Sequence, residues 1–149
     1  MSGINEKTRS PCVGICSTTY GDLVCRGCRR FAHEIVSWNG YTEEQKISIL
    51  ERLRQIKKEV VSQYLLIADR SRFDELCEEV GFDSVDLDEK VYAVLAFLIT
   101  KSERLDFSGL EVKDLCEDSS DVSKLMRFLE SEMYVRAQAH YERNFKIKI

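Results

Sequence analysis

Residues 12–28 read CVGICSTTYGDLVCRGC and hold four of the six cysteines of this 149-residue chain. The cysteines form two close pairs, C-x3-C and C-x2-C, joined by an eight-residue loop that is long enough to fold one pair back onto the other. Four thiolates complete the tetrahedral shell of a zinc ion or hold an iron–sulfur cluster. The spacing therefore predicts one metal site formed by Cys12, Cys16, Cys25 and Cys28.

One glycine lies inside each pair, Gly14 in the first and Gly27 in the second. A chain that wraps a metal often needs positive φ, and a missing side chain lets backbone N–H groups approach sulfur. A redox-active dithiol at Cys25–Cys28 is an alternative interpretation of the second pair. It leaves the first pair unexplained, and no βαβ pattern surrounds it, so the metal site is favoured.

The composition is typical of a folded helical protein, with 44% hydrophobic residues, 32% charged residues and one proline. The first ten residues are polar and lack the apolar core of a secretory signal, and no window is apolar for long enough to span a membrane. We therefore expect a cytoplasmic protein without membrane contact. Cysteines in that compartment usually serve metal or redox chemistry rather than disulfides.

Charge is unevenly distributed along the chain. Residues 1–41 carry five basic and three acidic side chains, and residues 42–149 carry seventeen basic and twenty-three acidic ones. This acidic bulk argues against a general nucleic-acid binder, whose affinity comes from a basic surface. Arg26, Arg29 and Arg30 flank the last cysteine and are the candidates for contact with a partner or with RNA, although they can equally balance the charge of the thiolates.

A helix is predicted directly after the cysteines, because Phe31, Ile35 and Trp38 recur at helical spacing. The second pair would then lie at a helix N-terminus, where free N–H groups stabilise thiolates. Thr42 and Gln45 form a capping-box pattern, and the apolar period that follows predicts a helix from about residue 43 to about residue 68.

The rest of the chain continues this helical pattern. Asp69 or Ser71 can cap a helix that Gly81 ends, and residues 118–120 can cap a last helix. The alternating residues 145–149 are typical of a strand that pairs near residues 105–107, frays, or adds to a partner's sheet. The remaining expectations are a buried helix over Glu89–Ile99, a short helical turn at Val112, Leu115 and Cys116, core positions for Cys77 and Cys116, and surface positions for His33 and His140.

Together these patterns predict a mainly α-helical protein. A four-cysteine module, with a treble-clef or ribbon-like loop plus helix, would cover residues 8–54. It would be continuous, through the helix that begins near residue 43, with a four- to five-helix domain over residues 55–149. There is no GxSxG, no phosphate-binding glycine loop and no HExxH, so no catalytic function is predicted.

Several motifs around the cysteines occur together within residues 8–54. They are SPCVGIC at residues 10–16, CRGCRR at residues 25–30, Glu34-Ile35, Trp38, and YTEE at residues 41–44.

These motifs resemble a family of small bacterial proteins, domain of unknown function 1289, whose members are often labelled predicted iron–sulfur proteins. One departure is Phe31, where the family suggests a small polar residue such as threonine. The resemblance implies a metal cluster at the four cysteines, but it carries no agreed function and does not separate zinc from iron.

The expected function is that of a non-catalytic accessory or adaptor protein. One zinc ion or one iron–sulfur cluster would fix a small surface for a protein partner. The alternatives are an iron–sulfur electron carrier or redox sensor and, third, an RNA-binding zinc module that uses the three arginines.

Overall fold

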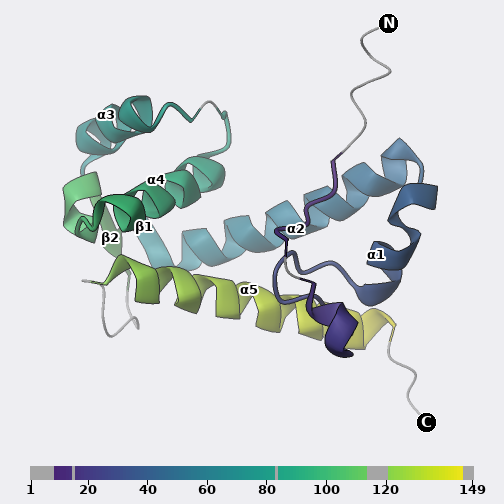
Figure 1. The fold of residues 1–149 in the computed structure, drawn as a ribbon. Helices are drawn as coiled ribbons and strands as arrows, with labels where there is room; N and C mark the ends of the chain where they lie inside the picture. Colours follow the sequence, from purple (N-terminus) through teal and green to yellow (C-terminus); the bar gives the residue numbers. More distant parts are fainter. Residues whose placement is uncertain (1–8, 15, 83, 114–120, 146–149) are drawn as a thin grey trace, which may run out of the picture. The chain divides into compact units, whose positions relative to one another are not determined.

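The computed structural model describes residues 9–14, 16–82, 84–113 and 121–145. These residues form five α-helices and one small two-stranded sheet, so the predicted mainly helical class is confirmed (Figure 1). The elements are η2 (Ser17–Tyr20), α1 (Ala32–Ser37), η3 (Trp38–Gly40), α2 (Glu43–Tyr64), β1 (Leu65–Ile67), α3 (Arg70–Val80), α4 (Leu87–Lys101), η4 (Leu105–Ser108), β2 (Leu110–Val112) and α5 (Val122–Asn144), where η denotes a 3-10 helix.

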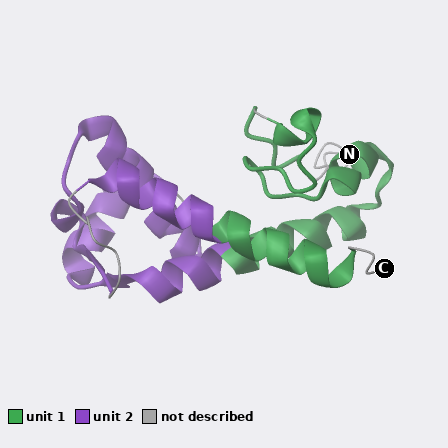
Figure 2. Ribbon diagram, turned by 90° about the horizontal axis from the view of Figure 1, so that it is seen from below, with its two compact units in different colours: residues 1–56, 133–149 green, residues 57–132 purple. Residues whose placement is uncertain are grey.

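The chain divides into two compact units (Figure 2). Unit 1 consists of Met1–Ile56 and Met133–Ile149, and unit 2 is Lys57–Glu132. Unit 1 therefore holds the four-cysteine segment together with the C-terminal half of α5. The division falls two residues beyond the predicted boundary at residue 54, and it assigns the end of the chain to the unit that contains the cysteines.

The N-terminus of α2 is built as its sequence indicates. The backbone N–H of Gln45 donates to the Thr42 hydroxyl at 3.1 Å, and the N–H of Thr42 donates to the Gln45 side chain at 2.8 Å. This reciprocal pair satisfies two N–H groups that have no partner within the helix, and it confirms the predicted capping box. The helix ends at Tyr64 rather than near residue 68, because the next residues form a strand.

The sheet of unit 2 was not predicted. β1 pairs antiparallel with β2 in the register Leu65 with Val112, Leu66 with Glu111 and Ile67 with Leu110. The predicted helical turn is therefore wrong at Val112, while Leu115 and Cys116 lie outside the described residues. Residues 105–107, expected as one possible pairing partner of a terminal strand over residues 145–149, belong to the 3-10 helix η4, and residues 146–149 lie outside the described residues.

Gly109 makes the turn into β2 possible. Its φ is 79°, and a Cβ built there would lie 2.5 Å from the carbonyl oxygen of Asp69. Its own carbonyl oxygen accepts the N–H groups of Ala68 and Asp69 at 2.8 and 3.1 Å. Only glycine satisfies both the left-handed backbone and the close approach of the two segments.

Helix α3 begins and ends where its sequence indicates. The Asp69 carboxylate accepts the N–H of Arg72 and caps α3, and Gly81, at φ 74°, closes it. α4 is the most apolar helix, as expected from Glu89–Ile99, although it begins earlier, at Leu87. Buried side chains of the unit include Val60, Phe73, Leu76, Val94, Leu95, Leu98, Leu105, Leu125 and Leu129.

Candidate metal centre

The second cysteine pair lies on a tight, buried turn. The N–H of Arg29 donates to the carbonyl of Cys25 at 2.8 Å, and the N–H of Cys25 donates to the carbonyl of Arg30 at 2.9 Å. An isolated β-bridge between Val24 and Phe31 closes the base of this turn. Cys25 and Cys28 are consequently 1% and 5% exposed.

The turn directs hydrogen-bond donors at the sulfur of Cys25. Burial raises the pKa of this thiol, but hydrogen bonds from the backbone N–H groups of Cys28, Ser17 and Gly27 and from the Cys28 side chain lower it, to about 7. Such donors stabilise a thiolate more than a thiol. Ser17 belongs to the segment of the first pair, and its hydroxyl also accepts the N–H of Arg26 at 2.8 Å.

Arg30 is the most unusual residue of the site. It is 3% exposed, and its Nε donates to the sulfur of Cys28 at 3.3 Å. Its guanidinium also lies over the ring of Trp38, 4.8 Å from the centroid. Burial raises the pKa of Cys28, whereas the hydrogen bond and the charge of Arg30 oppose that rise. None of the ion pairs among the described residues includes Arg30, so this buried cation faces sulfur instead of a carboxylate.

The first pair is arranged differently. Cys12 is exposed, and among the described residues its sulfur accepts one bond, from the N–H of Gly14 at 3.3 Å. Gly14 has φ 96°, which agrees with the positive φ expected inside this pair, whereas the same expectation is wrong for Gly27, because the positive φ of the second turn falls at Arg29. Cys16 is half-buried, and its sulfur lies 2.7 Å from the Thr18 hydroxyl.

The four cysteines are not gathered at one point. Within the described part of the chain, no group of three or more His, Cys, Asp or Glu side chains is placed so that it could hold a metal ion. The structure brings Cys25 and Cys28 together and leaves Cys12 and Cys16 apart from them. The donor set nevertheless fits a thiolate-bound metal at the second pair, because backbone N–H groups and a buried guanidinium already face its sulfurs.

The helix expected directly after Cys28 begins later than predicted. α1 starts at Ala32, so the second pair does not lie at its N-terminus. The positive charge near the Cys28 sulfur comes from the Arg30 side chain instead. The sequence Cys-Arg-Arg at residues 28–30 indicated a basic side chain near sulfur. It did not indicate which of the two arginines is buried.

Phe31 anchors the cysteine turn to the core of unit 1. It is fully buried and packs against three rings of α5 and the residue after it: His140, Tyr141 and Phe145, with centroids 5.2 to 5.7 Å away. The departure from the family pattern is therefore a core residue. Its aromatic partners lie far along the chain, so the sequence around Phe31 does not predict these contacts.

A buried ion pair supports the same anchor. Arg52 of α2 donates twice to the carboxylate of Glu34, with both distances 2.6 Å, and its guanidinium lies 4.1 Å from the centre of the Phe31 ring. Glu34 also accepts the backbone N–H of Phe31 at 2.8 Å. Eighteen residues separate the two charges, so sequence spacing alone did not reveal the pair.

The three candidate arginines occupy different environments. Arg26 has an exposed side chain, 3.4 Å from Asp22, and its guanidinium lies over the ring of Tyr134 at 4.6 Å. Arg29 is half-buried with φ 65°, and its Nη1 has no hydrogen-bond partner among the described residues. Arg30 is buried, so the three do not form one exposed basic surface.

The two remaining cysteines and the two histidines were given individual predictions. Cys77 is half-buried in unit 2, and burial raises its pKa. Cys116 lies outside the described residues. His33 is exposed, as predicted, whereas His140 is half-buried against Phe31 and was wrongly predicted to be a surface residue.

The site and fold define a helical protein with a cysteine-rich N-terminal segment. Residues 10–57, about a third of the chain, match the family described as a protein of unknown function, DUF1289, which confirms the resemblance seen in that segment. No curated protein and no solved structure matches the chain. None of the helices that the structure describes has the length and apolar character needed to cross a membrane.

Proposed function

We propose that the protein is a non-catalytic, metal-binding accessory protein. The observation that carries this proposal is the buried Cys25–Cys28 turn, in which backbone N–H groups and the Arg30 guanidinium face two sulfurs. A buried cation without a carboxylate partner favours negative charge on sulfur, and metal coordination supplies that charge by holding cysteine as a thiolate. The ligand is one zinc ion or one iron–sulfur cluster.

In this proposal Cys12 and Cys16 complete the ligand set. Their segment already touches the second pair, because Ser17 donates to the sulfur of Cys25 and accepts from the N–H of Arg26. Metal binding would tie the exposed first pair to the buried second one. Four thiolates on one metal contribute directly to folding, since no such site exists in the unfolded chain.

The role of the fixed loop is to present a surface to a protein partner. Three large apolar side chains of this loop are exposed: Val13 at 65%, Tyr20 at 87% and Leu23 at 57%. Apolar side chains held outward on a rigid loop are typical of protein-binding surfaces. The sequence contains no familiar catalytic motif beside these side chains. In this proposal the loop therefore functions by presenting a binding surface rather than by catalysing a reaction.

Anaerobic purification followed by metal analysis and a visible spectrum tests the site and identifies the metal. We expect one metal centre per chain, and each of Cys12→Ser, Cys16→Ser, Cys25→Ser and Cys28→Ser should reduce the metal content. Cys77→Ser is the matched control, because Cys77 lies in unit 2. Protein that contains no metal would refute the proposal, and full metal content in both first-pair variants would restrict the site to two cysteines.

An electron carrier or redox sensor is the second candidate. It is favoured by the exposure of Cys12, because a cluster with an exposed ligand can exchange electrons with a partner or react with oxidants. Iron with acid-labile sulfide and a reversible change of the visible spectrum on reduction would support this candidate. Colourless protein that contains zinc would exclude it.

A further inference from the structure

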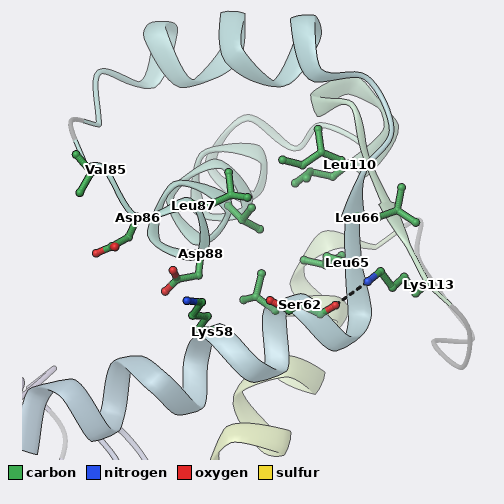
Figure 3. A pocket seen from close by; sticks show the side chains of 13 residues that line it. Lys58, Ser62, Leu65, Leu66, Val85, Asp86, Leu87, Asp88, Leu110 and Lys113 are labelled. Carbon is green, nitrogen blue, oxygen red and sulfur yellow. Dashed lines mark hydrogen bonds between the residues drawn. The ribbon is translucent and has the colours of Figure 1, made fainter.

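Unit 2 contains a cavity of about 580 Å³, and none of its lining residues belongs to the segment of the four candidate metal cysteines (Figure 3). This volume lies within the range of small-molecule sites in proteins, about 300–1,000 Å³. Residues of α2, β1, α4 and β2 line it, together with Val85, Asp86 and Lys113 beside these elements. Its floor is apolar and consists of the buried side chains Val61, Leu65, Val91 and Leu110.

The rim of the cavity is also apolar. Leu66, Val85 and Leu87 line it and are 37%, 96% and 44% exposed. Exposed large apolar side chains cost free energy in water when they gather at one place, and such gatherings mark binding sites. The rim therefore extends the apolar floor outward and favours a ligand with an apolar body.

One charged side chain is buried in this wall. Asp88, in the first turn of α4, is 7% exposed, and its Oδ2 has no hydrogen-bond partner among the described residues. In Figure 3 its carboxylate points toward the side of the cavity on which Lys58 lies. Buried polar atoms are normally hydrogen-bonded, so this oxygen lacks a donor that a ligand could bring. Asp88 lines the cavity, and because the last torsion of aspartate is broad, a rotation about it would turn this oxygen toward a ligand.

The lysines around the cavity do not cancel this charge. Lys113 is exposed and its Nζ donates to the carbonyl of Ser62 at 2.8 Å. Lys58 is also exposed, and none of the ion pairs among the described residues joins it to Asp88. Water and salt screen exposed charges much more than buried ones. The buried carboxylate therefore sets the preference for the charge of a ligand.

We propose that this cavity binds a small amphipathic amine. The apolar part would lie against Val61, Leu65, Val91 and Leu110, and the protonated nitrogen would donate to the carboxylate of Asp88. This site is independent of the metal centre, since all its lining residues belong to unit 2.

Three matched probes test the chemistry on the unsubstituted 149-residue chain. Hexylammonium, hexan-1-ol and hexanoate share one chain and differ in the head group, and their binding is followed by amide chemical shifts in NMR. We expect hexylammonium to bind at least about tenfold more tightly than hexanoate. Its shifts should concentrate at residues 58–67, 85–91 and 110–113. Equal or tighter binding of hexanoate, or shifts located elsewhere, would overturn the proposal.

A charge-removing variant then tests the assigned residue. Asp88→Asn keeps the size of the side chain, and we expect it to weaken hexylammonium binding to the level of hexan-1-ol while hexan-1-ol binding stays unchanged. Asp106→Asn is the control, because its carboxylate is exposed and does not line the cavity. Unchanged hexylammonium binding in Asp88→Asn would remove the role of Asp88. If that variant does not fold, the comparison of the three probes still decides the proposal.

Discussion

The two cysteine pairs of the same loop differ in what holds them. Cys25 and Cys28 are buried in a turn whose base is closed by Phe31, and their sulfurs face backbone N–H groups and Arg30. Cys12 is exposed, and its sulfur has one local hydrogen bond among the described residues. Protein groups alone supply the contacts of the second pair, so we expect that half of the proposed site to be held without metal and the first half to depend on the metal. The predictions below test this asymmetry.

The largest effect is expected from the aromatic anchor of the second pair. Phe31→Ala should lower the free energy of unfolding of unit 1 by about 3–5 kcal/mol, because it leaves a cavity under the cysteine turn. Trp38 is the only tryptophan of the chain, so its fluorescence during urea denaturation reports on this unit. Val36→Ala, at an 85% exposed position of α1, is the control and should change the stability by no more than about 0.5 kcal/mol. Equal effects of the two variants would contradict the anchor.

The ion pair behind the anchor should have the next largest effect. Glu34→Gln keeps the shape of the side chain but leaves Arg52 facing a neutral amide, and we expect a loss of about 2 kcal/mol. The Arg52 and Glu34 side chains are 20% and 7% exposed, so water reaches only part of the pair.

Asp22→Asn provides the comparison for this prediction, since it breaks the exposed pair with Arg26, whose side chains are 34% and 68% exposed. Exposed pairs contribute about 0–1 kcal/mol. Urea denaturation of both variants should separate them clearly, and a larger loss in Asp22→Asn would contradict the role of the Glu34–Arg52 pair in supporting the anchor.

A direct test of the asymmetry replaces one cysteine of each pair in metal-free, reduced protein. Cys28→Ser replaces the buried sulfur that accepts from Arg30 with a smaller hydroxyl, which lengthens that hydrogen bond and leaves a gap in the packing, and it should cost about 1–2 kcal/mol. Cys12→Ser changes an exposed side chain and should stay within about 0.5 kcal/mol of the natural protein. Similar losses in the two variants, measured by the same Trp38 fluorescence, would show that both pairs are built before metal binding.

Local patterns predicted the helices well because their causes are local. The capping box of Thr42 and Gln45 and the cap at Asp69 lie within three residues of the groups that they satisfy. The sheet was missed for the opposite reason. Leu65–Ile67 continues the apolar period of α2, so its local pattern indicates a helix. It forms a strand because it pairs with Leu110–Val112, which follows more than forty residues later.

The same distinction applies to the candidate site. The four cysteines are visible in the sequence because two ligands must be close in sequence to form each half of a compact metal site. The groups that hold the second pair in place are not visible in this way. Phe31 meets His140 and Tyr141 across more than one hundred residues, and the inward orientation of Arg30 depends on the ring of Trp38.

The smallest expected effect is a pH dependence of the anchor at His140, which stacks on Phe31 with ring centroids 5.7 Å apart. Burial lowers the pKa of His140, the charges of Arg52 and Arg143 lower it further, and Glu34 raises it. The folded protein therefore binds this proton less readily than the unfolded chain. The contribution of neutral His140 to stability is fully present above the unfolded pKa, near 6.5, and decreases as the pH falls through that value.

His140→Gln should therefore lose less stability than the natural protein when the pH is lowered from about 7.5 to about 5.5. Urea denaturation at several pH values measures the difference between the two curves, in which contributions shared by both proteins cancel. His33→Gln removes the other histidine of the chain and is the control. If both variants flatten the curve equally, the dependence belongs to the histidine pair around Phe31 and Phe145. If His140→Gln makes the stability depend more steeply on pH, then His140 is not buried in its neutral form against Phe31. In that case His140 does not help to hold the second cysteine pair.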